Sequence, residues 1–337
     1  MGDPMDYYVY PLRFVTPVHF GDTAQGGTLE DLSLTFSSDS FFGACCNELA
    51  HNTEVLYTFI DDVMNGRIVM SSLFPYYIDG DNWQYYVPVP MIRVETADIV
   101  TRSYTETKLE AIKQKRLKKR AYMRASQVKH FSDTVQYHID GVMPIFVERN
   151  VTTQVNMRGT QSRPYYVGNY RFMPNAGLYI IIGFSDESQK NFFDALIESI
   201  GYTGIGGKRS SGYGKFELAD DPTWLSEGFY EDDIALYDMI SAPQESIRMC
   251  MSTCVPQMVE DIQRLKQGQF KLKKRSGFVV AEGATTQVKR KSYYALAEGS
   301  ISQHSIEGAV IKIESDALPY AVYRNGRGFW IGVDLHE

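Results

Sequence analysis

The segment from residue 177 to residue 218 constrains the fold of this chain more than any other. Residues 178–182 form a continuous apolar run, which is typical of a strand buried on both faces. Ser185 or Asp186 can cap the helix that follows. Apolar residues recur on one face of that helix, namely Phe192, Phe193, Leu196, Ile197 and Ile200. The helix is expected to end at Gly201 and to be followed by a second strand.

A similar strand and helix open the chain. Residues 7–15 are rich in Tyr, Val and Phe, as strands are. A helix beginning near the polar cluster at 37–40 carries Phe41, Phe42, Cys45 and Leu49 on one face. With the strand expected at 213–218, these units follow the β-α…β-α-β order of a ferredoxin-like (RRM-like) domain, interrupted by a long insertion.

The insertion and the C-terminal part contain further strand signals. Residues 73–94 resemble an irregular strand pair, and Asp140-Gly141 is a hairpin signal. Residues 108–127 are rich in Lys and Arg and contain no Gly or Pro, and this pattern predicts a basic helix. Beyond residue 225, one helix at 258–266 is surrounded by strand-like segments at 247–255, 270–280, 288–296, 309–313 and 329–333.

We therefore predict an α+β protein of two ferredoxin-like domains. The N-terminal domain would span 1–225, with the insertion around 95–165, and the C-terminal domain would span 226–337. With 44% hydrophobic residues, the chain can bury a core of real size. Its longest apolar run is far shorter than the ~20 residues that a membrane-spanning helix needs. No secretion signal opens the chain.

The four cysteines are too few for a disulfide scaffold. Neither the adjacent pair Cys45-Cys46 nor Cys250 with Cys254 has the spacing that zinc hooks prefer. Buried, reduced thiols are the expectation, and they indicate a cytoplasmic protein. We predict no metal and no other cofactor.

Charge is segregated along the chain, although the net charge is only −7. Residues 108–129 carry nine basic residues and one acid, and residues 264–291 carry nine basic residues and one acid. Residues 217–261 carry eleven acids and one arginine. Such a chain can offer a basic groove to phosphates and an acidic face to a protein, although each block also fits a solvated helix face.

The glycine-rich loop at 201–216 points to chemistry most directly. Six glycines in fourteen positions free the backbone to aim its N–H groups at one point. Lys208 and Arg209 add charge, and two serines add hydroxyls, which suits an anionic backbone. The loop is not a phosphate-binding Walker loop, because Tyr202 stands where that motif needs glycine. A flexible surface turn is the alternative.

This loop resembles the signature loop of the RAMP superfamily of CRISPR effector proteins. Its residues 204–218 read Gly-Ile-Gly-Gly-Lys-Arg-Ser-Ser-Gly-Tyr-Gly-Lys-Phe-Glu-Leu. The whole ordered set is most similar to the Csm subunit of type III-A complexes that holds the 5′ repeat-derived tag of the CRISPR RNA. Further matching segments, in chain order, are 19–21, 27–29, 34–41, 72–75, 171–172 and 274–278.

The resemblance implies a non-catalytic scaffold that anchors the RNA tag in RNA-guided antiviral defence. It implies a thumb-like β-hairpin, from about 135–165, that reaches over the duplex of guide and target RNA. The implied protein partners are a large polymerase-like signature subunit and a repeated backbone RAMP subunit. The RNA-binding residues that we expect are His19, Ser38, Gly204, Gly206, Gly207, Lys208, Arg209, Ser210, Ser211, Gly212, Tyr213, Lys274, Arg275 and Ser276.

A second function stays open at this point. Some RAMP relatives cut RNA with a histidine as general acid or base, so this chain could be a metal-independent endoribonuclease that matures CRISPR RNA. His19 is the candidate, because it lies just ahead of the glycine-containing segment 21–27. A hydrogen-bonded structural role is the commoner fate of a histidine at the end of a first strand.

Overall fold

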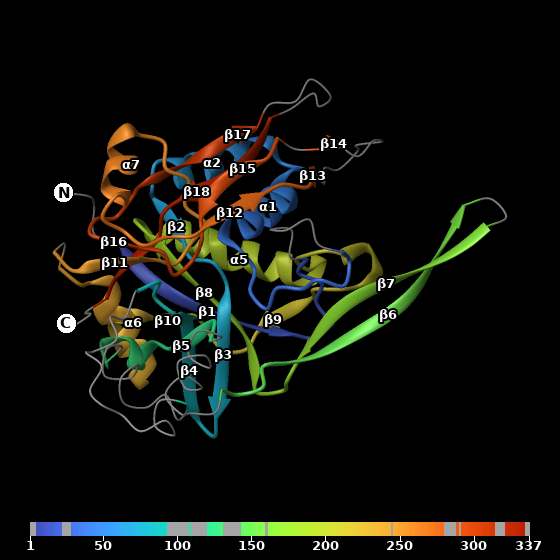
Figure 1. Cartoon of the computed structure of the whole chain (residues 1–337), viewed down its shortest axis with the longest axis horizontal. Helices are drawn as coiled ribbons and strands as arrows, with labels where there is room; N and C mark the ends of the chain where they lie inside the picture. The colour runs from blue at the N-terminus through green and yellow to red at the C-terminus, as the bar shows by residue number, and fades with distance from the viewer. Residues whose placement is uncertain are drawn as a thin grey trace.

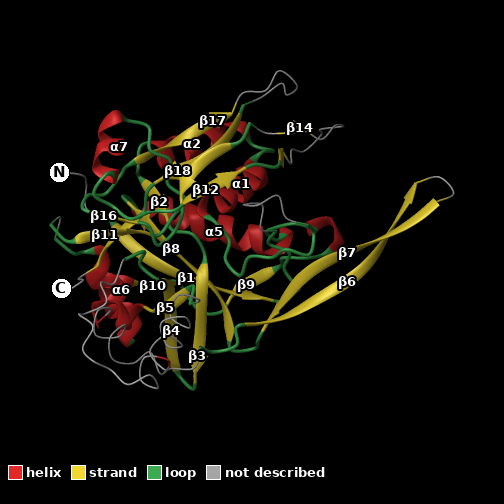
Figure 2. Ribbon diagram, viewed as in Figure 1, coloured by secondary structure: helices red, strands yellow, loops and turns green. Residues whose placement is uncertain are grey.

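The computed structural model describes residues 5–21, 28–92, 108, 120–130, 143–158, 161–243, 245–279, 288–289, 291–313 and 321–333. Figure 2 shows a mixed arrangement of helices and antiparallel strands in these residues. The α-helices with described bounds are α1 (Ser38–Leu49), α2 (Thr53–Met64), α5 (Glu187–Thr203), α6 (Glu231–Ile240) and α7 (Val259–Leu265). None of the helices among the described residues is long and apolar enough to cross a membrane.

One large antiparallel sheet organises the molecule. Its strands are β1 (Asp6–Phe14), β2 (Ile68–Met70), β3 (Phe74–Asp79), β4 (Asn82–Pro88), β5 (Tyr122–Arg124), β8 (Ala176–Phe184), β9 (Phe216–Leu218) and β10 (Thr223–Trp224). The order is β10-β1-β8-β3-β4-β5, while β2 also pairs with β8 and β9 with β1. The strands that the sequence predicts near 7–15 and 178–182, and the strand pair at 73–94, are confirmed.

Strand β8 is buried at every position and feeds two cores. Leu178, Ile180 and Ile182 pack in the cluster that contains the apolar faces of α1, α2 and α5. Tyr179 and Ile181 point to the other side, where they join α6 and strands of the C-terminal half. This alternation follows from the two-residue period of a strand. It explains why the β8 segment is a continuous apolar run and not an alternating one.

The remaining strands of the C-terminal half form small antiparallel sheets. They are β11 (Ile247–Cys250), β12 (Leu272–Arg275), β13 (Phe278–Val279), β14 (Val288–Lys289), β15 (Tyr293–Leu296), β16 (Ile301–Ser302), β17 (Gly308–Ile313), β18 (Val322–Arg327) and β19 (Trp330–Val333). One of these sheets has three strands in the order β16-β11-β19, and the other three are the pairs β12-β15, β13-β14 and β17-β18. The predicted helix at 258–266 is α7. The domain boundary at 225–226 stays a prediction.

A long hairpin leaves the body of the molecule. Strands β6 (Val147–Arg158) and β7 (Gln161–Phe172) pair antiparallel from Val147↔Phe172 to Arg158↔Gln161. Figure 1 shows the hairpin projecting well beyond the other elements. A hairpin is therefore present, but it lies further along the chain than the predicted 135–165. The predicted turn at Asp140-Gly141 lies outside the described residues.

The predicted basic helix at 108–127 is wrong in its last part. Tyr122–Arg124 is strand β5, which pairs with β4, and a 3-10 helix, η1 (Ala125–His130), follows it. Met123 lies opposite Val87 and is buried, so packing against the sheet edge outweighs the helix propensity of the segment. Residues 109–119 lie outside the described residues, as do residues 22–27 of the glycine-containing segment after His19.

Candidate functional site

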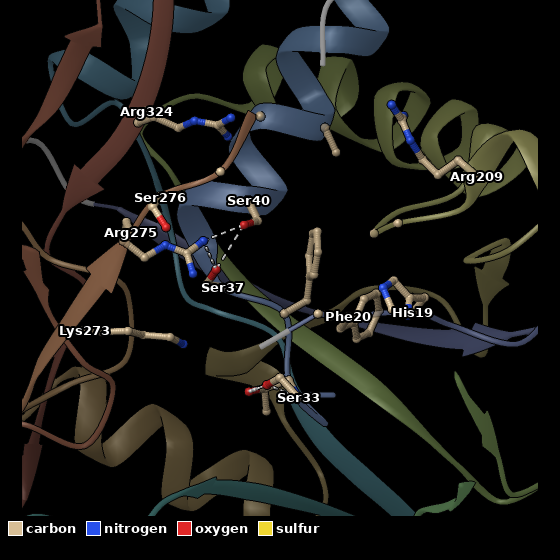
Figure 3. Close-up of a pocket in the computed structure, with 18 of the residues that line it drawn as sticks. His19, Phe20, Ser33, Ser37, Ser40, Arg209, Lys273, Arg275, Ser276 and Arg324 are labelled. Carbon is tan, nitrogen blue, oxygen red and sulfur yellow. Dashed lines mark hydrogen bonds between the residues drawn. The ribbon is translucent and has the colours of Figure 1, made fainter. Parts of the chain in front are cut away.

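A cleft of about 410 Å³ lies between the glycine-rich loop and strands of the C-terminal half. Figure 3 shows His19 and Arg209 on one side of it and Arg275 and Ser276 on the other. The cleft is lined by His19, Phe20, Gly21, Ser33, Thr35, Phe36, Ser37, Ser40, Gly43, Ala44, Asn47, Gly206, Gly207, Arg209, Lys273, Arg275, Ser276, Gly277 and Arg324. Segments more than 250 residues apart in sequence therefore meet at one site.

Close packing against His19 and Phe20, in the segment that follows β1, explains two of the loop glycines. A Cβ atom at Gly206 would lie 2.7 Å from the Phe20 ring, and its φ of +89° also favours glycine. A Cβ atom at Gly207 would lie 2.6 Å from the His19 ring. The amide of Gly207 donates to the His19 carbonyl oxygen at 2.9 Å. These contacts hold the loop as one wall of the cleft.

Most loop amides already have acceptors within the protein. Those of Ile205, Gly207, Ser211, Gly212, Tyr213 and Gly214 donate to carbonyls of the loop itself or of residues 17–19. Among the described residues, no acceptor pairs with the amides of Lys208, Arg209 and Ser210. Lys208 is left-handed (φ 61°, ψ 21°) and the 3-10 turn η2 (Arg209–Ser211) follows. Successive amides in such a turn can converge on an anion.

The His19 side chain is a hydrogen-bonded link between the segment that follows β1 and the hairpin. Its Nδ1 lies 2.7 Å from the Gly168 carbonyl oxygen, and only 6% of the residue is exposed. Because a carbonyl oxygen only accepts, Nδ1 carries the hydrogen in this contact. The other ring nitrogen, Nε2, is then free to accept a hydrogen bond when the ring is neutral.

Lys208 does not line the cleft. Its ammonium nitrogen lies 3.3 Å from Gln154 Oε1 and 3.3 Å from the Tyr165 hydroxyl oxygen, both on the hairpin. It also stands 5.1 Å from the centre of the Tyr165 ring. The two neighbouring basic residues of the loop therefore have different surroundings, since Arg209 lines the cleft.

Arg275 is held by a buried network at the start of α1. Its guanidinium donates to both Asp39 carboxylate oxygens, at 2.9 and 2.7 Å. It also donates to the Ser37 and Ser40 hydroxyls, at 2.9 and 2.7 Å. The Tyr293 hydroxyl donates to Asp39 at 2.9 Å. This network joins β12 and β15 to α1 and forms the floor of the cleft.

The charges in this network stabilise each other. Burial raises the pKa of Asp39, but the guanidinium groups of Arg275 and Arg324 outweigh it and hold that pKa well below its usual range. Burial lowers the pKa of Arg275, but Asp39 more than compensates and leaves it raised. The Nε of Arg324 is buried and has no partner among the described residues. Arg324 is therefore a partly unsatisfied cation at the cleft wall.

Lys273 and Lys274 lie differently although they are adjacent. Lys273 lines the cleft and its ammonium lies 3.8 Å from Glu298. Burial raises the pKa of Glu298, but Lys273 and a hydrogen bond from Ser72 outweigh burial, and the pKa is lowered. Lys274 is exposed and is not part of the cleft lining, because successive residues of β12 point to opposite faces.

The structure brings part of the predicted site together. His19, Gly206, Gly207, Arg209, Arg275 and Ser276 line the cleft. Gly204, Ser210, Ser211, Gly212 and Tyr213 belong to the same loop but not to the lining, and Ser210 and Ser211 are exposed. Ser38 is fully buried, and its hydroxyl accepts from the Thr253 amide.

Several lining residues were not among the predicted RNA-binding residues. They include Ser33, Thr35, Phe36, Ser37, Ser40, Asn47 and Arg324. From the polar cluster at 37–40 the sequence predicts only Ser38 as an RNA-binding residue, whereas Ser37 and Ser40 line the cleft and Ser38 does not. Nothing in the sequence near Arg324 distinguishes it. The described residues contain no group of three or more metal-ligating side chains.

Comparisons with known proteins find relatives that cover nearly the whole chain. Residues 243–333 match the CRISPR Csm4 C-terminal domain. The chain is 26% identical to the CRISPR system Cms protein Csm4 of Streptococcus thermophilus, over 98% of this chain and 100% of that one. It is 28% identical to the protein of the same name from Thermococcus onnurineus, over 89% of this chain and 92% of that one.

Solved structures share the fold. One chain in the crystal structure of a Csm3-Csm4 subcomplex in the type III-A CRISPR-Cas interference complex matches with a TM-score of 0.59 and 18% identity, over 97% of this chain and 99% of that one. One in the crystal structure of a Csm1-Csm4 cassette in complex with pppApA matches with a TM-score of 0.59 and 19% identity, over 99% and 100%. The resemblance predicted from the sequence is thus confirmed.

Proposed function

We propose that this Csm4-type chain anchors the 5′ repeat-derived tag of a CRISPR RNA and acts as a non-catalytic scaffold subunit of a type III-A (Csm) complex. One observation carries the proposal: the glycine loop, the segment 19–21 that follows β1 and the basic turn after β12 converge on a single cleft. The cleft offers backbone amides, hydroxyls and cations together, and these are the groups that bind an RNA backbone.

The arrangement of the central sheet supports a ferredoxin-like N-terminal domain. Strands β9, β1, β8 and β3 lie in that order, and α1 and α5 follow β1 and β8 in sequence. This is the strand order expected of β-α-β-β-α-β units, in which β2 and β3 share the place of the second strand. We propose that the C-terminal half is a second unit of the same kind, and that the glycine loop is the RAMP signature loop.

The partners that we propose follow from the relatives. Proteins named Csm4 occur in crystal structures with Csm1 and with Csm3. By analogy, this chain would bind a large polymerase-like signature subunit and a backbone RAMP subunit in the cytoplasm, for antiviral defence. The β6–β7 hairpin would reach over the guide-target duplex next to the tag, so target RNA is a further partner.

The cations in the cleft are not equivalent for RNA binding. Asp39 compensates most of the charge of Arg275, and Glu298 part of that of Lys273. Arg209 lines the cleft; among the described residues it has no ion pair, and no acceptor pairs with its amide or with those of Lys208 and Ser210. We therefore assign to Arg209 the main phosphate contact of the loop. Arg275 keeps its predicted RNA contact as a proposal.

The salt dependence of tag-RNA binding tests this assignment. Replacing Arg209 with Ala should weaken binding to an RNA that carries the 5′ tag and should lower the slope of log K against log [salt] by about one phosphate contact. Arg13→Ala is the matched control, because Arg13 forms an exposed ion pair with Glu217 on β9, outside the cleft lining. Equal slopes for wild type and Arg209→Ala would contradict the proposal.

The endoribonuclease alternative has one supporting observation: Nε2 of His19, a residue of the cleft lining, has no hydrogen-bond partner among the described residues. Against it, we propose that His19 only positions the hairpin and contacts RNA, because the described lining of the cleft contains no second histidine, carboxylate or tyrosine to act as its acid–base partner. Labelled repeat RNA, incubated with excess chelator, should stay intact with wild type and with His19→Ala. Cleavage by wild type that disappears in the variant would establish the alternative instead.

A further inference from the structure

Lys208 stands in a backbone conformation that costs a lysine free energy. It is the one non-glycine residue with positive φ among the described residues, where nine glycines share that property. A glycine at position 208 would avoid the cost. The lysine side chain must therefore make interactions that offset it.

Those interactions are with both strands of the hairpin at once. Gln154 is on β6 and Tyr165 lies directly opposite it on β7. The Tyr165 hydroxyl donates to Gln154 Oε1 at 2.6 Å, and the Lys208 ammonium donates to both oxygens at 3.3 Å. The ammonium also meets the face of the Tyr165 ring, which adds a cation–π attraction. One cation thus contacts both strands of the hairpin, β6 and β7.

A second attachment holds the hairpin nearer its base. His19 donates to the Gly168 carbonyl, and Val18 pairs with Tyr170 through two backbone hydrogen bonds. Tyr165 lies three residues further out along β7 than Gly168, which is about 10 Å at the rise of a strand. A contact at that distance resists swinging of the hairpin about its base more effectively than the base contacts can.

We infer that Lys208 is a positioning residue: its ammonium fixes the direction of the β6–β7 hairpin against the glycine loop and binds no RNA phosphate. The hairpin then leaves the body at an angle set by the same loop that lines the cleft. The biological consequence rests on the proposed function, because the direction of the hairpin matters if it reaches over a duplex beside the anchored tag.

Spin-label distances between the hairpin and the body test the inference directly. Labels at Thr153 on β6 and Glu198 on α5, both exposed, report the direction of the hairpin. They would be attached through unnatural amino acids, because the chain has native cysteines. The full chain without RNA should give a narrow distance distribution. Lys208→Gly, which relaxes the backbone while it removes the ammonium, should broaden that distribution at least twofold.

Two further variants distinguish the loss of the Lys208 contacts with the hairpin from general damage to the loop. The double variant Gln154→Ala with Tyr165→Leu removes the partners of the Lys208 ammonium on the hairpin. It should broaden the distance distribution in the same way as Lys208→Gly. Arg209→Ala changes the neighbouring cation, which has no hydrogen bond or ion pair with the described residues of the hairpin, and should leave the distribution narrow. A distribution that stays narrow in Lys208→Gly or in the hairpin double variant would overturn the inference.

RNA binding by the same variants shows whether the inference or the proposed function fails. Lys208→Gly should leave the salt slope of tag-RNA binding unchanged, whereas Arg209→Ala should lower it by about one. A slope lowered by about one in Lys208→Gly would make Lys208 a phosphate ligand and overturn the inference alone. Should neither variant alter RNA binding while Lys208→Gly loosens the hairpin, the inference stands and the proposed function fails.

Discussion

At the scale of single residues, the cleft depends on a buried ion pair more than on exposed charge. Asp39 is fully buried, and Arg275 reaches it across a sequence separation of more than 200 residues. Removing one partner of such a pair leaves an uncompensated buried charge, which is costly. The pair therefore fixes the position of β12, and with it Lys273 and Ser276, relative to α1. We interpret Asp39 as a structural residue of the cleft.

Replacing Asp39 with Asn should lower the free energy of unfolding by about 3–5 kcal/mol at neutral pH, measured by urea denaturation. Arg13→Ala, which breaks an exposed pair, should cost about 1 kcal/mol or less. The folded-state pKa of Asp39 is lowered, so its stabilisation is complete above the unfolded pKa of about 3.9 and is lost as pH falls towards the folded value. The difference between wild type and variant should therefore narrow below about pH 4. A variant as stable as wild type at pH 7 would contradict this account.

At the scale of elements, the sequence predicts the helices and strands that are specified by features within their own segment. Helix α5 has its cap at Asp186 and an apolar face of regular spacing, and β8 has its apolar run, so both were predictable. Strand β5 was not, because its conformation depends on pairing with β4 and on the burial of Met123. The hairpin was predicted in kind but displaced in position, since Asp140-Gly141 is a stronger turn signal in the sequence than Gly159-Thr160, which separates β6 from β7.

The same distinction applies to the candidate site. The glycine loop was recognisable in the sequence because positive φ at Gly206 and close packing at both Gly206 and Gly207 demand residues without a side chain. The sequence could not predict that Lys208 contacts the hairpin while the adjacent Arg209 lines the cleft, because this depends on where the hairpin passes. The contact between Arg275 and Asp39 is invisible in sequence for the same reason: only the tertiary fold brings β12 to the start of α1.

At the scale of the whole molecule, the two halves share one hydrophobic core and one cleft. Residues of the C-terminal half, among them Met249 and Ile331, pack in the same core as Tyr179 and Ile181 of β8. Part of the acidic segment 217–261 is structural, because Asp232 is buried and accepts hydrogen bonds from the Tyr85 amide and from Arg124. The central sheet thus holds both walls of the cleft in a fixed relation.

Photocrosslinking of tag RNA from both walls of the cleft tests the central claim most directly. A photoreactive amino acid would replace Ser210 in the glycine loop or Ser276 after β12, and Glu198 on the exposed face of α5 would be the control site. The account predicts RNA adducts from positions 210 and 276, both dependent on an intact 5′ tag, and none from position 198. Adducts from neither wall, or adducts that do not depend on the tag, would contradict it.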